Sequence, residues 1–581
     1  MNSKTKTCQS CKKGFTIEPE DFEFYEKIGV PAPTFCSECR NQRRMSFRNE
    51  RSLYKRKCDL CGMDIVSRYS PSPPSSWKNS LKVYCSKCWW SDKWDALEYA
   101  QEYDINKSFF DQFKEIIQKT PSPSLFQMGQ SVNSDWVNYE SFDKNCYLNV
   151  GGGYNEDSAY NTYLAWGNNS FDNYFTLKSN LCYETIFSKN CYKVFFSQHC
   201  YDCQDVILSY DCKNCSNLIG CIGLRHKKYY IFNKPYSKKE YFDFLDKNPI
   251  SSYKSLNLIK KEAKKNILKF PHRYTVLSKS IDCFGNYITQ SKNCQNCWEI
   301  EDVENSKYVY IAAIGIKDVY DIYAVGENSE LIYEIMSGGR FCYRDKFSIS
   351  LTQCRDLDYC LEMQDCHDCF GCRGLIKKSY CILNKQYSLE SYTKLKSKII
   401  KKMKEDKEYG EFFPISLSPF GYNESVAQDY YPLNKTQSLK IGANWNDYES
   451  KEKYQFSDYQ IPDNINDVKD DILKKILKCE KSNKAYKIIP MELKFYRQMG
   501  LPIPKRSPLQ RYRDRLSQKN PWKLYYRQCM CAGDTDDTKT YKNTIKHEHK
   551  DKHCPNEFQT SYAPDRKEIV YCEKCYQKEV Q

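Results

Sequence analysis

Long apolar runs are missing from this chain of 581 residues. No stretch is long enough to span a bilayer, and the lysine-rich start lacks the apolar core of a secretory signal. We therefore expect a soluble, cytoplasmic protein with no membrane partner. The chain also lacks a phosphate-binding loop, a nucleophile elbow and an HExxH motif, so its sequence does not indicate an enzyme.

Cysteine, in contrast, is abundant, with 32 residues. Secreted disulfide scaffolds are short, whereas this chain is long enough for three or four domains. Because we expect a cytoplasmic location and many of the cysteines form Cys-x-x-Cys pairs, the pattern indicates zinc ligands rather than disulfides.

Two four-cysteine sets stand at the start of the chain. Their members are Cys8, Cys11, Cys36 and Cys39, then Cys58, Cys61, Cys85 and Cys88. Paired knuckles at this separation suit tetrahedral zinc, whose four thiolates close a structural site and leave no open position for catalysis. Each second knuckle leads into a helical pattern, which predicts a treble-clef finger.

A shift of 471 residues superposes this start on the other end of the chain. Phe24 falls on Phe495, Arg40 falls on Arg511, and Cys8 survives as Cys479. The other three thiols of the first finger become Ser482, Ser507 and Gln510. One thiolate cannot hold zinc, so this copy is predicted to be metal-free and to keep its shape by packing. A helix over 467–480 is expected to lead into it.

The last finger keeps its second knuckle, Cys572 and Cys575, but its first knuckle is altered. Cys529 is retained, and Cys531 and Cys554 compete for the place of Cys61. His547, His549 and His553 lie in an insertion, where their irregular spacing favours a solvated loop over metal ligands. We expect three Zn²⁺ ions, two in the N-terminal fingers and one in the finger of residues 529–575.

The middle of the chain consists of short β-rich pieces punctuated by Asn, Asp and Gly, with cysteines recurring at nine-residue intervals, as at Cys182, Cys191 and Cys200. It is itself duplicated, with an offset of 151 residues, and each half closes with a helical stretch, 237–268 and 388–407. Even, brief strands are typical of a solenoid. The recurring cysteines are interpreted as an interior stack, with metal binding by their Cys-x-x-Cys pairs as the open alternative.

The predicted fold is therefore mainly β: a two-part right-handed parallel β-solenoid flanked at both ends by treble-clef or zinc-ribbon modules with short helices. The predicted divisions are a first finger with a basic helix (1–57), a second finger with helices (58–120), the two solenoid halves with their closing helices (121–270 and 271–410), a connector (411–460), the metal-free copy of the first finger (461–528) and the C-terminal zinc finger (529–581).

The formal net charge of +15 is concentrated in the two copies of one basic segment. Residues 40–57 and 511–528 together supply +12 of it. Interleaved aromatics make the segment a candidate track for a phosphate backbone, with RNA favoured over duplex DNA because no recognition helix is evident. Neutralisation of zinc thiolates explains part of the charge, but not in the copy that has lost its metal. The candidate nucleic-acid contacts are Arg40, Arg43, Arg44, Arg48, Arg51, Arg511, Arg513 and Arg515.

The segment from Cys8 to Arg44, with the pattern C-x-x-C-x-x-x-F…FY…G…P…C-x-x-C-R, resembles a family of short bacterial probable zinc-ribbon domains. The layout of the whole chain resembles uncharacterised multi-zinc-finger proteins of candidate-phyla bacteria. These resemblances imply zinc binding and no particular activity.

We therefore predict a non-catalytic zinc protein that binds nucleic acid through its basic segments. A protein-interaction scaffold that uses the solenoid surface is the alternative. A carbohydrate-active β-helix comes third, with Glu299, Glu301, Asp302 and Glu304 as its candidate acids.

Overall fold

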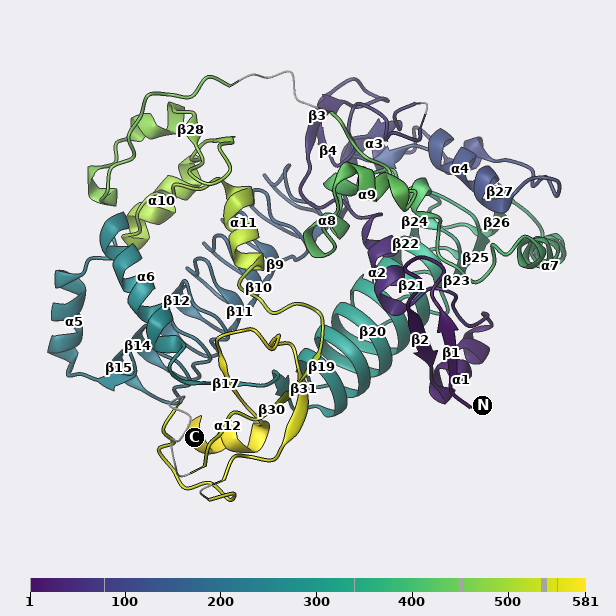
Figure 1. The fold of residues 1–581 in the computed structure, drawn as a ribbon. Coiled ribbons are helices and arrows are strands. Elements are labelled where there is room, and N and C mark those ends of the chain that lie inside the picture. The colour runs from purple at the N-terminus through teal and green to yellow at the C-terminus, as the bar shows by residue number, and fades with distance from the viewer. Residues whose placement is uncertain are drawn as a thin grey trace. The chain divides into compact units, whose positions relative to one another are not determined.

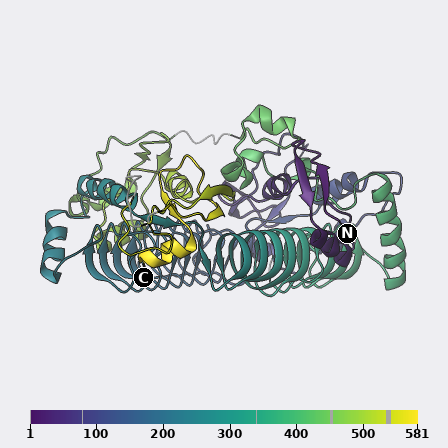
Figure 2. The same ribbon diagram turned by 60° about the horizontal axis from the view of Figure 1, so that its bottom comes forward.

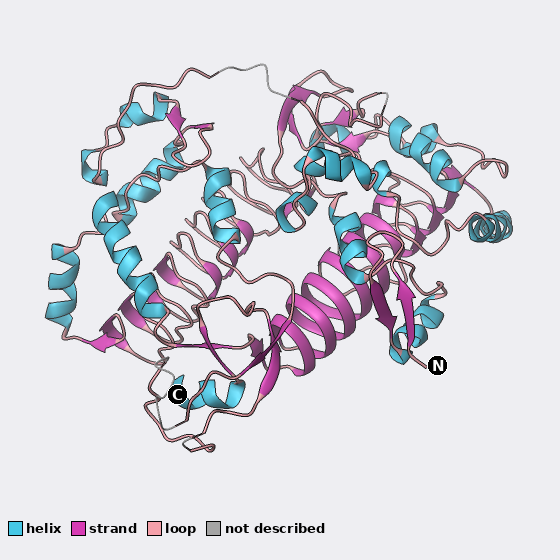
Figure 3. Cartoon of the chain, in the orientation of Figure 1, coloured by secondary structure: helices cyan, strands magenta, loops and turns pink. Residues whose placement is uncertain are grey.

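The computed structural model describes residues 2–77, 79–338, 340–448, 454–533, 541–550 and 552–580 (Figures 1 and 3). The chain divides into two compact units, residues 1–125 with 276–449 and residues 126–275 with 450–581. Each unit therefore combines one terminal module with the half of the middle region that lies farther from it in sequence.

Both halves of the middle region are parallel β-solenoids, with about 21 turns between them. Figure 2 shows the coils of each half edge-on, with the terminal module of the same unit lying along one side of them. Strands of successive coils pair in parallel at a spacing of 12 residues, as Tyr174 with Ile186 and Gln204 with Ser216. The predicted mainly-β solenoid is confirmed.

The solenoid of residues 126–275 is built from short strands. They are β7 (Gln127–Met128), β8 (Glu140–Ser141), β9 (Thr162–Ala165), β10 (Tyr174–Leu177), β11 (Ile186–Lys189), β12 (Tyr192–Phe195), β13 (Gln204–Ile207), β14 (Ser216–Ile219), β15 (Lys228–Ile231) and β16 (Lys234–Pro235). Helices α5 (Lys238–Lys247) and α6 (Tyr253–Ile267) close this half, and β17 (Pro271–Arg273) follows.

The second solenoid has longer strands, and some of its coils contain 11 or 13 residues instead of 12. Its strands are β18 (Leu277–Ser278), β19 (Ile281–Thr289), β20 (Lys292–Val325), β21 (Glu330–Gly338), β22 (Lys346–Thr352), β23 (Arg355–Asp358), β24 (Leu361–Gln364), β25 (His367–Phe370), β26 (Ser379–Ile382) and β27 (Lys385–Gln386). The closing helix is α7 (Leu389–Glu405), and the connector carries η2 (Ile415–Leu417), η3 (Tyr422–Glu424), α8 (Ala427–Tyr430) and α9 (Lys435–Lys440).

Each coil is a square of four residue triplets. Along the chain every third residue has a positive φ near 50°, as at Leu181, Glu184 and Phe187. Such left-handed residues each cost on the order of 1 kcal/mol unless they are glycine. The cost is offset by hydrogen bonds to the coils on both sides: the Glu184 N–H donates to Phe171 O, and the Tyr183 N–H donates to Val194 O. Asn and Asp are common at these corners because they tolerate the left-handed region.

Every third side chain points into the narrow interior, where only small residues fit. Cys182, Thr185, Ser188, Cys191 and Val194 follow one another in this way, and all are buried. Interior polar atoms bond to neighbouring coils; Asn161 Nδ2 and N, for example, both donate to Asn149 Oδ1. Since nine residues are three triplets, the nine-residue cysteine spacing keeps each thiol inside, in agreement with the interior-stack interpretation.

The N-terminal module contains the two predicted fingers. The first comprises β1 (Lys4–Thr7), β2 (Gly14–Ile17), α1 (Pro19–Ile28) and α2 (Ser37–Met45). The second comprises β3 (Tyr54–Lys57), β4 (Asp64–Ser67), β5 (Val83–Tyr84) and α3 (Ser86–Trp89). After it come η1 (Ala96–Tyr99), α4 (Phe109–Lys119) and β6 (Ser122–Pro123).

The C-terminal module repeats these elements at the 471-residue shift. It comprises η4 (Ile465–Asp467), η5 (Asp470–Lys474), β28 (Leu477–Lys478), β29 (Ala485–Tyr486), α10 (Pro490–Met499), α11 (Pro508–Leu516), β30 (Tyr525–Gln528), β31 (Glu557–Thr560), β32 (Ile569–Tyr571) and α12 (Glu573–Val580). The bounds of α10 and α11 are those of α1 and α2 plus 471. The helix expected over 467–480 is wrong: the segment forms short 3₁₀ turns and then a hairpin strand, because Ile472 and Leu477 are buried in the core of this unit.

Candidate metal centres and surfaces

The local fold brings the first four thiols together. Cys8 and Cys11 lie in the turn between β1 and β2, while Cys36 caps α2 and Cys39 lies in its first turn. The Sγ atoms of Cys11 and Cys36 are 3.7 Å apart, and the Cys36 N–H donates to Cys8 Sγ. The second set has the same form, with 3.9 Å between the Sγ atoms of Cys61 and Cys85. In each set the ligand atoms all lie within 4.8 Å of one another.

Thiols this close share protons. A hydrogen bond with Cys39 lowers the pKa of Cys36 to about 5, and the same bond raises the pKa of Cys39 far above its usual range. A divalent cation would replace the shared protons. Four thiolates with no open position fit a structural zinc site, in which metal-binding energy is folding energy.

The C-terminal finger resolves the competition between Cys531 and Cys554. Cys554 joins Cys529, Cys572 and Cys575 in a complete four-thiol group, with its Sγ 3.9 Å from that of Cys572. Cys531 belongs to a different group, with His547, His549 and Cys575. The solvated-loop interpretation is therefore wrong for His547 and His549, whereas His553 is exposed and belongs to neither group. Among the described residues, groups of three or more potential ligands occur in the terminal modules and not in the solenoids.

The degenerate finger keeps its fold without a thiol cluster. Ser507 replaces Cys36 as the N-cap residue, and its hydroxyl accepts the N–H of Gln510. Gln510 Nε2, in the place of the fourth thiol, donates to Asp514 Oδ1 at 2.9 Å. Asp514 also pairs with Arg506 and Lys481. A polar network thus occupies the position at which the first finger gathers its thiols.

Most of the candidate arginines of the first basic segment are buried against carboxylates of their own unit. Arg40 Nη2 lies 2.7 Å from Asp321 Oδ2, and Arg44 pairs with both Asp321 and Glu334. Arg43 pairs with Glu411 at 3.0 Å. Arg48 and the half-buried Arg51 both bond to Glu50.

The second basic segment repeats the arrangement. Arg511 Nε and Arg515 Nη1 each lie 2.9 Å from an oxygen of Asp172, and Arg511 Nη2 lies 2.9 Å from Glu492 Oε1. Arg513 is exposed. The assignment of these arginines to a phosphate track is therefore corrected for Arg40, Arg43, Arg44, Arg48, Arg511 and Arg515. Their guanidinium groups are buried and fasten each module to a solenoid.

Aromatic rings accompany the arginines at both junctions. Phe24 stacks on Tyr320 with ring centroids 3.9 Å apart, and Phe495 stacks on Phe171 at 4.4 Å. The residue after each ring, Tyr25 or Tyr496, packs against the next coil. The same side chains of the repeat thus make the same contacts in both units.

The acids considered for carbohydrate chemistry do not converge. Glu299 is buried, whereas Asp302 and Glu304 are exposed. Asp302 accepts the backbone N–H of Gly315. None of them belongs to a ligand cluster in the described residues.

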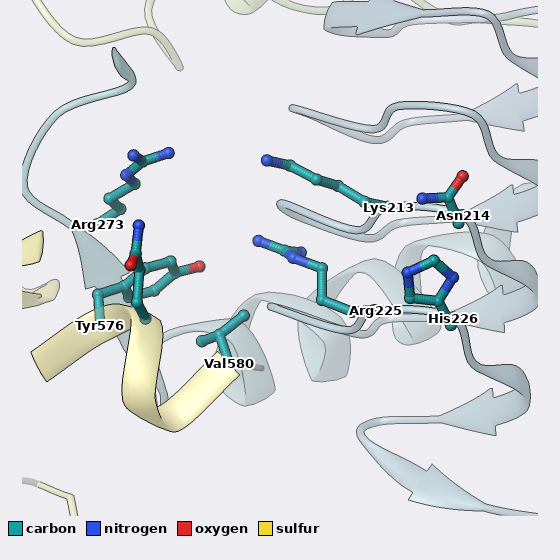
Figure 4. A pocket seen from close by; sticks show the side chains of 8 residues that line it. Lys213, Asn214, Arg225, His226, Arg273, Tyr576 and Val580 are labelled. Atoms are coloured by element: carbon teal, nitrogen blue, oxygen red, sulfur yellow. The ribbon is translucent and has the colours of Figure 1, made fainter. Parts of the chain in front are cut away.

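A cationic pocket of about 440 Å³ lies in the second unit, between the solenoid coils and α12. In Figure 4, Lys213 and Arg225 reach from successive coils toward Arg273 and Tyr576 on the opposite side. Arg225 pairs with Asp211, and Arg273 pairs with Glu573. Burial lowers the pKa of Lys213, Asp211 opposes this shift, and the two arginines reinforce it. Three cations and two carboxylates leave the site able to accept an acidic group.

An exposed ridge leads along the same solenoid to this pocket. Its members are exposed corner residues at a 12-residue spacing, one on each coil: Phe142, Tyr154, Trp166, Lys178, Asn190, Asp202, Asn214 and His226. The first three are 41%, 42% and 43% exposed, and their rings stack, with centroids 5.0 and 5.7 Å apart. Lys178 Nζ lies 5.8 Å from the Trp166 ring centroid, and Asn214 and His226 line the pocket.

Comparison with known proteins adds no identification: no protein-family model matches this chain, and none of the curated proteins does. In the part of the chain that the structure describes, each helix is too short or too polar to cross a bilayer.

Proposed function

We propose that this protein is a non-catalytic interaction scaffold in which zinc-supported modules brace two β-solenoids. Its working surface is the ridge of the first solenoid. The observation that carries the proposal is the ridge itself, eight exposed corner residues with stacked aromatics at one end and a cationic pocket at the other. The alternative use of the basic segments is weakened because most of their guanidinium groups are buried against carboxylates.

The chemistry of the ridge suits an extended protein segment. Exposed aromatic rings attract apolar side chains, and Lys213 with its two arginine neighbours attracts a carboxylate. Coils about 4.8 Å apart would present one recognition position after another along such a segment. The partner is therefore expected to carry apolar residues followed by acidic ones.

Selection from a random peptide-display library on the immobilised full chain tests this proposal. We expect enrichment of peptides that combine apolar and acidic residues. Their affinity should fall by about tenfold or more when Phe142, Tyr154 and Trp166 are replaced by serine, because such aromatic anchors dominate binding energy. Tyr526→Ser is the matched control, since Tyr526 is 79% exposed but lies outside the ridge.

Two results would overturn the proposal. One is a selection whose peptides bind the serine variant as well as the wild type. The other is RNA retention on filters that weakens steeply with salt and is unaffected by the ridge substitutions, which would restore the nucleic-acid function. Replacement of Lys213 by alanine should reduce the preference for acidic residues without removing the apolar one.

A further inference from the structure

The C-terminal finger contains more metal ligands than one ion can use. The four-thiol group consists of Cys529, Cys554, Cys572 and Cys575, and the mixed group consists of Cys531, His547, His549 and Cys575. Within each group the ligand atoms lie within 4.8 Å of one another, and Cys575 belongs to both. Seven side chains therefore form two four-ligand sets.

The mixed group has the dimensions of a tetrahedral zinc site. Cys531 Sγ lies 3.6 Å from His547 Nδ1 and 3.4 Å from His549 Nε2. His549 Nε2 lies 3.5 Å from Cys575 Sγ. Zn–S bonds of about 2.3 Å and Zn–N bonds of about 2.0 Å at tetrahedral angles put ligand atoms roughly 3.5 Å apart.

Both imidazole rings are oriented by a partner on their second nitrogen. His547 Nε2 is 3.1 Å from Glu579 Oε1, and His549 Nδ1 is 2.6 Å from the carbonyl oxygen of Lys552. The Glu579 carboxylate is itself held by the backbone N–H of Thr544. This arrangement leaves Nδ1 of His547 and Nε2 of His549 facing Cys531. Acceptors of this kind on the second nitrogen are characteristic of histidine ligands of metals.

The thiolate of the mixed group also has an outer partner. Asn543 Nδ2 donates to Cys531 Sγ at 3.2 Å, and it donates to Gly533 O as well. The segment that carries Asn543 and His547 is thus folded back onto α12, where Cys575 and Glu579 lie one turn apart.

We propose that this finger binds two zinc ions at once, with Cys575 Sγ as a thiolate bridge between them. One ion is held by the four thiols and the other by Cys531, His547, His549 and Cys575. Both are closed four-ligand sites, so the cluster is structural rather than catalytic. Five thiolates and two Zn²⁺ leave a net charge of −1, less than the −2 of one isolated four-thiolate site. This inference is independent of the proposed scaffold function.

Zinc counting by native mass spectrometry of the full chain tests the cluster. The wild type should bind four zinc ions, two in the N-terminal fingers and two in the cluster. His547→Gln with His549→Gln should bind three, and the matched control His553→Gln should bind four. Cys572→Ser should lose one ion, whereas Cys575→Ser should lose two, because only Cys575 serves both sites.

Three zinc ions in the wild type, or four in the double histidine variant, would overturn the second site. Loss of a single ion in Cys575→Ser would overturn the bridge. If that variant does not fold, the wild type loaded with ¹¹³Cd provides the decision. Two cadmium resonances coupled through the shared sulfur support the bridge, and four uncoupled resonances contradict it. Peptide binding to the ridge does not enter any of these measurements.

Discussion

Neighbouring arginines on one helix have opposite environments in this protein. Arg511 is buried against Asp172 and Glu492, whereas Arg513, two positions along α11, is exposed. Burial raises the pKa of Glu492 while Arg511 opposes the shift, so the carboxylate depends on its arginine to stay charged. Residue type alone therefore does not say which arginines remain available to a ligand.

Replacement of Arg511 by methionine should strongly destabilise the second unit. Removal of one partner from a buried ion pair costs about 3–5 kcal/mol, because the remaining carboxylates are left uncompensated. Arg513→Met is the control and should change the free energy of unfolding by less than about 0.5 kcal/mol. Chemical denaturation of the full-length variants measures both. Equal stability of the two variants would show that the Asp172 pairs do not hold the module.

Asp143 should make the stability of the first solenoid depend on pH. Burial raises the pKa of this interior carboxyl group to about 6, although it accepts the Asn155 N–H. Because the pKa is higher in the folded state than in the unfolded state, its contribution is fully present below pH 4 and is lost as the pH rises through 6. Asp143→Asn removes this loss and keeps the acceptor.

The gain in unfolding free energy from Asp143→Asn should therefore grow by about 1 kcal/mol between pH 5 and pH 7.5. Denaturation of both proteins at these two pH values gives the difference, and the narrow range avoids acid release of zinc. A gain that stays constant with pH would mean that Asp143 is ionised throughout.

At the scale of elements, the two copies of the first finger reach one backbone by different means. Gly29 and Gly500 both end their first helix in the left-handed conformation, and both second helices begin on a capping residue. In one copy thiols gather at that cap, and in the other Gln510 and Asp514 bond there. The metal site and the polar network are thus alternative supports for the same hairpin and helices.

Removal of zinc with a chelator should separate the two copies. The amides of β1, β2 and the first turn of α2 should lose protection from hydrogen exchange, because the metal-binding energy of that finger is folding energy. The equivalent elements β28, β29 and α11 should keep their protection. Exchange measured by mass spectrometry before and after chelation compares them within one sample. Equal loss in both copies would mean that the second copy depends on metal elsewhere in the chain.

At the scale of the whole molecule, the chain is paired crosswise: its first module packs on the second solenoid and its last module on the first. Loosening should follow these units rather than distance along the sequence. Arg44→Met should therefore raise hydrogen exchange in β20 and β21, whose Asp321 and Glu334 it leaves unpaired, more than in β9 to β14.

The Arg511→Met variant provides the reciprocal measurement, with increased exchange in β9 to β11 rather than in β20 and β21. Equal loosening of both solenoids by either variant would contradict the division into two units. These comparisons use peptides of the same full-length chain, so each solenoid serves as the control for the other.

The sequence alone determined the features that depend on neighbours along the chain. Cys-x-x-Cys spacing predicted the two N-terminal ligand sets, and the 471-residue shift predicted the second copy with its missing thiols. The short strands and the nine-residue cysteine spacing predicted a solenoid, because one interior position in three is enough to leave a periodic signal. A regular coil repeats its local environment, and the sequence repeats with it.

Tertiary structure decided what depends on partners far away in sequence. Asp321 and Asp172, more than 250 residues from the arginines they neutralise, turned an apparent phosphate track into a buried junction. Folding of the insertion back onto α12 placed His547 and His549 beside Cys531, which irregular spacing did not indicate. A charge or an imidazole gives no local sign of its partner, because pairing in space leaves no period in the sequence.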